Sequence, residues 1–67
     1  MAEIVLLASS GTVEGIERCL NSYFCSRSWR VDPVTLEARD EARGLELKKH
    51  LRIIKKRGRY RFERIRD

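Results

Sequence analysis

The sequence predicts an α+β domain of two layers, in which one amphipathic helix packs on a largely antiparallel sheet in the order β-α-β-β-β. Three observations lead to this class: a short aliphatic run near the start, a segment of helical periodicity after it, and several alternating, β-rich stretches towards the end. With 67 residues, the chain is long enough for a single small domain spanning residues 1–67. Such a domain has a thin core, which leaves a homodimer as one possible assembly.

The first two elements are a strand and a helix. Residues 3–9, EIVLLAS, are rich in Val, Ile and Leu and end at SSGT, which is typical of a buried strand. Apolar residues then recur at steps of three and four from Val13 to Tyr23, so residues 11–24 are predicted to form the helix, with Ser10 or Thr12 as its N-cap. The residues expected on its opposite, polar face are Glu14, Glu17, Arg18 and Asn21.

A hairpin is predicted to follow the helix, over residues 27–32 and 35–39. Trp29 and Val31 alternate with polar residues, which places both on one buried face. Asp32-Pro33 suits the start of a turn because Pro presets the backbone φ angle at the second turn position. The polar segment after this hairpin, RDEARG, is expected to be a loop ending at Gly44.

Residues 45–56, LELKKHLRIIKK, fit either a strand or a second helix at about 41–56. A two-residue turn at Arg57-Gly58 favours the strand, because Gly supplies a positive φ and the following residues then pair well. The resulting cross-strand pairs are Ile53 with Phe62 on one face and Arg52 with Glu63 on the other. We therefore predict a basic C-terminal hairpin and retain the second helix as the alternative.

Positive charge is concentrated in the last twenty residues. The whole chain has a formal charge of +5, whereas residues 48–67 contain ten Lys or Arg residues against Glu63 and Asp67, a net of +8. Such a block favours binding to a polyanion, although a solvated surface that deters aggregation has the same composition.

The hairpin register divides the basic residues from the aromatic ones. Tyr60 and Phe62 are expected to face the helix, which leaves cations on the opposite face to contact phosphates. The candidate nucleic-acid-binding residues are Arg52, Lys56, Arg57, Arg59 and Arg61. We hypothesise a non-enzymatic protein that contacts the DNA or RNA backbone, or alternatively an acidic protein surface. The alternative function is a protein-interaction module or small homodimeric regulator with a merely solvated basic face.

The remaining features indicate no catalytic or cofactor site. Cys19 and Cys25 match no zinc spacing and are expected to be buried, reduced thiols. His50 is the single histidine, and the sequence contains no recognisable pair of residues for general acid–base catalysis. We therefore expect no enzyme activity, metal or cofactor. The aliphatic run is too short for a signal peptide or a membrane span, so we expect a cytoplasmic protein without a membrane partner.

Overall fold

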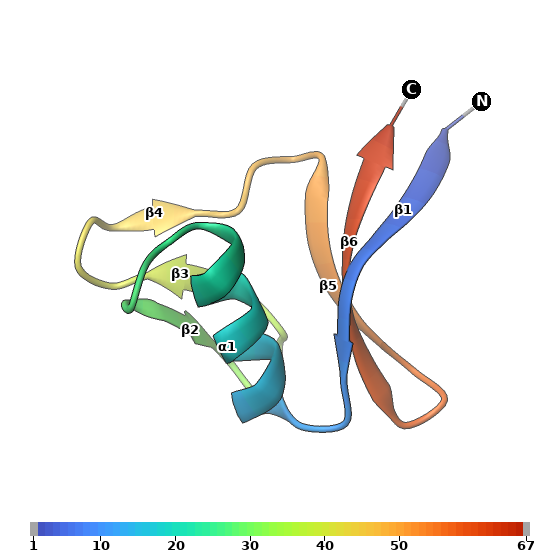
Figure 1. Cartoon of the computed structure of the whole chain (residues 1–67), viewed down its shortest axis with the longest axis horizontal. Helices are drawn as coiled ribbons and strands as arrows, with labels where there is room; N and C mark the ends of the chain where they lie inside the picture. The colour runs from blue at the N-terminus through green and yellow to red at the C-terminus, as the bar shows by residue number, and fades with distance from the viewer. Residues whose placement is uncertain (1, 67) are drawn as a thin grey trace.

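The computed structural model describes residues 2–66 and contains one helix and two antiparallel three-stranded sheets (Figure 1). The first sheet has the order β1-β6-β5, and the second has the order β2-β3-β4. The element bounds are β1 (Glu3–Ser10), α1 (Val13–Tyr23), β2 (Trp29–Val31), β3 (Ala38–Asp40), β4 (Leu45–Glu46), β5 (Leu51–Lys56) and β6 (Arg59–Arg66). The predicted α+β class is confirmed, but the strands after α1 divide between two sheets instead of completing one.

Helix α1 begins and ends with specific backbone hydrogen bonds. The Thr12 hydroxyl accepts from the Gly15 N–H at 3.0 Å, and the Ser10 hydroxyl accepts from the Thr12 N–H at 3.3 Å. At the other end, Cys25 has a φ of +52°, and the Ser26 N–H donates to the carbonyl of Asn21 at 2.8 Å. This is the Schellman arrangement that ends a helix and favours glycine. Thr12 is therefore the N-cap, one of the two residues predicted.

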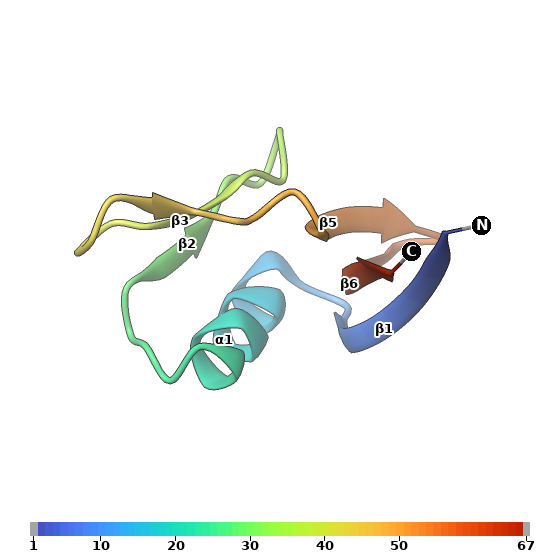
Figure 2. The ribbon, with the colours of Figure 1, turned by 90° about the horizontal axis from the view of Figure 1, so that it is seen from above.

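The core lies where α1 meets both sheets. Its fully buried members include Ile16 and Leu20 of α1 and Phe62 of β6, while Trp29 and Val31 of β2 close it from the other side. Viewed from above, α1 lies below the junction between the two sheets (Figure 2). The predicted inward positions of these five residues are thus confirmed, whereas Tyr23, predicted on the same apolar face of α1, is 48% exposed.

Two residues predicted on the polar face of α1 instead attach the second sheet to it. The Glu17 carboxylate accepts from the Val31 N–H at 2.9 Å. The Asn21 side chain accepts from the Trp29 N–H at 2.9 Å and donates to the Trp29 carbonyl at 3.4 Å. Both side chains supply the hydrogen bonds that a further strand would give to β2, so they satisfy its backbone at the sheet edge.

The hairpin between the helix and the basic segment forms with shorter strands than predicted. β2 and β3 pair from Trp29–Asp40 to Val31–Ala38. The Asp32 carboxylate accepts from the N–H groups of Val34 and Thr35, which holds the pKa of Asp32 below its ordinary value. These hydrogen bonds hold Val34 and Thr35 in the turn. The second strand therefore begins at Ala38 and not at residue 35 as predicted.

The alternative prediction of a second helix at about 41–56 is wrong, and the predicted C-terminal hairpin is confirmed. Residues 45–46 and 51–56 are strands, and β5 pairs with β6 in the predicted register. Arg57 and Gly58 form the turn with φ angles of +52° and +77°. Two positive φ angles are the property of a type I′ turn, whose twist suits a two-residue hairpin.

Candidate nucleic-acid interface

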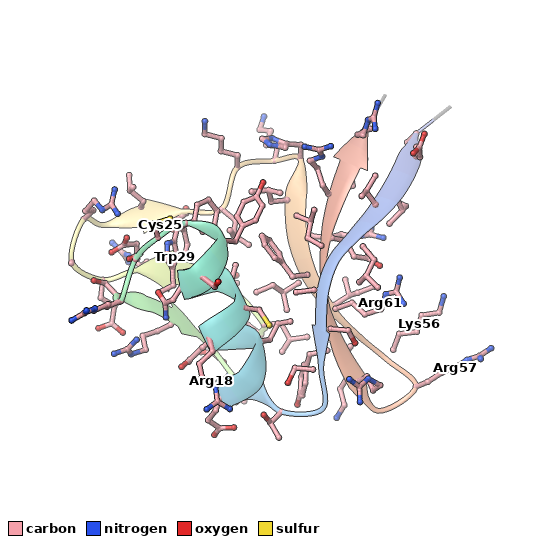
Figure 3. The ribbon with its side chains drawn as sticks, in the orientation of Figure 1. Arg18, Cys25, Trp29, Lys56, Arg57 and Arg61 are labelled. Carbon is pink, nitrogen blue, oxygen red and sulfur yellow. The ribbon has the colours of Figure 1, made fainter. Side chains whose placement is uncertain are left out.

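The sheet β1-β6-β5 has an inner face towards α1 and an outer face away from it. Leu51, Ile53 and Phe62 are buried on the inner face. Strand alternation assigns the neighbouring residues to the outer face. Outer-face residues of the hairpin are Arg52, Ile54 and Lys56 on β5 and Arg59, Arg61 and Glu63 on β6. Side chains of Lys56, Arg57 and Arg61 lie on the side of the sheet away from α1 (Figure 3).

Glu63 joins two of the predicted site residues. Its Oε1 accepts from Arg52 Nε at 2.9 Å, and its Oε2 accepts from Arg61 Nε at 2.7 Å. Each arginine thus donates one N–H group to Glu63. A guanidinium has five N–H donors, so the others can bind a further acceptor. The Arg52 and Arg61 side chains retain 41% and 33% of their accessible surface.

The Glu63 carboxylate is buried although it lies on the face predicted to be solvated. Only 2% of the residue is exposed. Burial raises the pKa of Glu63, but the hydrogen bonds from Arg61 and Arg52 outweigh burial, so the pKa lies below its ordinary value. Glu63 is consequently ionised near neutral pH and holds the two arginines in place. The predicted pairing of Arg52 with Glu63 is confirmed. The contact with Arg61 was not predicted, although Arg61 precedes Glu63 on the same face of β6.

The other three predicted residues surround the hairpin turn. Lys56 lies directly opposite Arg59, and both are exposed, as is Arg57 in the turn. Arg59 Nε donates to the Ser9 hydroxyl at 3.2 Å, which ties this side chain to β1. The opposition of Lys56 and Arg59 has an electrostatic cost that a bound anion would offset.

The aromatic residues of the hairpin do not form a stacking platform on the outer face. Phe62 is fully buried, and Tyr60 is half-buried on the inner face. The Lys55 ammonium lies 5.4 Å from the centre of the Tyr60 ring, which covers that ring with a cation. The outer hairpin face is therefore suited to phosphate contacts more than to base stacking.

All five predicted residues are gathered around the hairpin, on one face and at its tip. Together they contribute five positive charges against the one negative charge of Glu63, a local net of +4. We define this set, Arg52, Lys56, Arg57, Arg59 and Arg61, as the hairpin cations. Comparisons with protein-family models, curated proteins and solved structures found no match to this chain.

Other predicted features have the following outcomes. Both cysteines are free, as expected, but Cys19 is only half-buried and Cys25 is exposed, so the expectation of two buried thiols is met in part for Cys19 and is wrong for Cys25. Its place at the end of α1 explains the exposure.

Among residues 2–66, no three His, Cys, Asp or Glu side chains gather as metal ligands would. Within the same residues, no helix has the length and apolar character to span a membrane.

Proposed function

We propose that this protein binds the phosphate backbone of a nucleic acid through the hairpin cations and has no catalytic role. The observation that supports the proposal is the gathering of five cations around one hairpin, three of them arginines anchored by Glu63 or Ser9. Anchored guanidinium groups lose less conformational freedom on binding than free ones do. The affinity that they provide depends on salt and only weakly on base sequence.

Phosphate is the ligand that these side chains match best. A guanidinium presents a planar fork of donors that suits two oxygens of one phosphate, and four of the five hairpin cations are arginines. A two-stranded ribbon is also narrow enough to enter the major groove of duplex DNA. An acidic protein would offer carboxylates to the same donors, so it is included in the test as a competing ligand.

Two matched double variants test the proposal. Lys56 and Arg59 are exposed cations directly opposite each other on β5 and β6. Arg30 and Arg39 are in the same relation on β2 and β3 of the other sheet. K56E/R59E and R30E/R39E therefore change the net charge equally and each replaces one like-charge pair by another. R39E also removes the cationic partner of Glu46 on β4, so the folding of both variants is checked by circular dichroism. Only the first pair belongs to the hairpin cations.

The measurement is a mobility-shift titration of duplex DNA and of RNA at low and at physiological salt. Wild type is expected to shift nucleic acid with an affinity that weakens steeply as salt rises, because bound cations release counterions from the backbone. K56E/R59E should lose the shift and R30E/R39E should retain most of it. Equal losses in both variants would show that net charge alone is responsible. Binding to polyglutamate in preference to nucleic acid would point to an acidic protein partner.

A further inference from the structure

Three of the four sheet edges are protected against pairing with another strand. The edge of β2 is occupied by the hydrogen bonds from Glu17 and Asn21. The edge of β4 is only the two residues Leu45–Glu46 long. The edge strand β5 carries Arg52, Lys55 and Lys56, and charged side chains on an edge strand oppose the approach of a second strand.

The fourth edge, β1, is long, its backbone is unoccupied by side-chain hydrogen bonds within residues 2–66, and its one charged residue is Glu3 at its first position. β1 is eight residues long, EIVLLASS, and contains no Lys, Arg or Pro. Among the described residues it pairs with β6 alone, and both views show it outermost in its sheet (Figures 1 and 2). An irregularity between Leu6 and Ala8 divides its pairing with β6 into two regular stretches, and the longer one is the first half of the strand, from Glu3 to Leu6.

The same half of β1 exposes apolar side chains on the outer face. Ile4 and Leu6 lie opposite Ile65 and Glu63 of β6, and they retain 45% and 46% of their accessible surface. A strand that is apolar on both faces and has an unpaired edge is complementary to another copy of itself. An isologous contact of this kind closes with two-fold symmetry and does not extend into a fibre.

We propose that the chain forms a homodimer in which β1 pairs antiparallel with β1 of a second copy. With Val5 on the two-fold axis, Ile4 of each copy lies opposite Leu6 of the other, which brings the exposed aliphatic side chains into contact across the axis. In this register Glu3 of one copy approaches the irregularity at Leu7 of the other, so the two Glu3 residues do not oppose each other. The two sheets become one sheet of six strands.

The dimer places the hairpin cations at both ends of one continuous face. The hairpin turn lies beside the end of β1, because Ser10 pairs with Tyr60. Antiparallel pairing of two β1 strands sends the two turns in opposite directions while their outer faces remain on the same side. The proposed self-pairing does not depend on nucleic-acid binding and is tested without it.

The first test is the mass of the protein in solution, measured by light scattering and sedimentation over a wide concentration range. We expect a dimer that persists at high salt, because its contacts are backbone hydrogen bonds and apolar side chains. Leu6→Lys should weaken the dimer about tenfold or more, since lysine on an edge strand opposes pairing. Leu45→Lys is the matched control, because Leu45 is 48% exposed on the other sheet, and it should leave the dimer intact.

The second test uses crosslinking and does not require a destabilising charge. In a C19S/C25S background, Val5→Cys places one thiol of each copy at the axis, so oxidation should give a covalent dimer at low protein concentration. Leu45→Cys in the same background should give no covalent dimer after oxidation. A wild-type monomer at every concentration would overturn the proposal. So would a dimer that Leu45→Lys dissociates and Leu6→Lys does not, or crosslinking at position 45 in place of position 5.

Discussion

Replacing Glu63 by glutamine tests whether the buried carboxylate stabilises the hairpin through Arg52 and Arg61. The substitution preserves the size of the side chain and removes its charge. Glutamine has one acceptor oxygen, so one of the two arginine hydrogen bonds at 2.9 Å and 2.7 Å loses its acceptor and meets an NH₂ group instead. The other bond persists without the assistance of the negative charge.

The expected cost follows from the exposure of the three groups. A hydrogen bond to a charged group stabilises a protein by about 1.5–3 kcal/mol. Both arginines keep a third or more of their surface in water, with 41% and 33% exposed, so screening reduces the contribution of each bond. We therefore expect E63Q to lower the free energy of unfolding by roughly 1–3 kcal/mol.

Urea unfolding followed by the fluorescence of Trp29 measures this change, because Trp29 is the single tryptophan and is only 3% exposed. The matched control is E46Q, since Glu46 lies directly opposite Arg39 in an exposed cross-strand pair. We expect E46Q to change stability by at most about 0.5 kcal/mol. Equal effects of E63Q and E46Q would refute the stabilising role of the Glu63 cluster.

The pH dependence of stability gives an independent check. The pKa of Glu63 is lower in the folded protein than in the unfolded chain, so the unfolded state binds more protons on acidification. The stabilisation is complete above the unfolded pKa and is lost as the pH falls through the folded pKa. Asp32, whose pKa is lowered by the Thr35 and Val34 N–H groups, acts in the same direction. E63Q should therefore flatten the loss of stability in acid without abolishing it.

Three further substitutions test the backbone geometry by the same unfolding measurement. Arg57→Asn should raise the free energy of unfolding by roughly 0.5 kcal/mol, because asparagine accepts the φ of +52° more readily; a lower stability would argue against the type I′ turn. Cys25→Gly should stabilise the end of α1 by about 1 kcal/mol, as the left-handed position favours glycine, and no gain would contradict the Schellman motif. Gly15→Ala should destabilise despite its better helix propensity, since its Cβ would lie 1.9 Å from the Ser10 hydroxyl oxygen. Adding Ser10→Ala should recover part of that loss, and a failure to do so would contradict the clash.

Local patterns were sufficient to predict the hairpin that carries the candidate site. The Arg57-Gly58 turn and the pairing of Ile53 with Phe62 determine the register of β5 and β6, and this register also determines which cations lie on the outer face. Such features depend on neighbours in sequence and on a two-residue repeat. The same is true of α1, whose periodicity and capping residue are local.

Features that depend on distant contacts were not predicted. Glu17 and Asn21 fall on the polar side of the helical pattern, yet they bond to β2 because the chain returns past α1 after residue 28. Glu63 is polar and lies on the outer face, yet it is buried by neighbours on both adjacent strands. In each case the hydrogen bonds of a polar side chain depend on partners distant in sequence, which hydrophobic periodicity does not report.

The salt dependence of nucleic-acid affinity tests the central proposal most directly. Fluorescence anisotropy of a labelled DNA duplex gives the association constant at several salt concentrations, and the slope of its logarithm against that of salt reports the phosphates neutralised. With three to five hairpin cations in contact, we expect a slope of roughly −2.7 to −4.5 for wild type and a shallower slope, by about 2, for K56E/R59E. No measurable binding at low salt, or a slope near zero, would contradict a backbone-binding role for the hairpin.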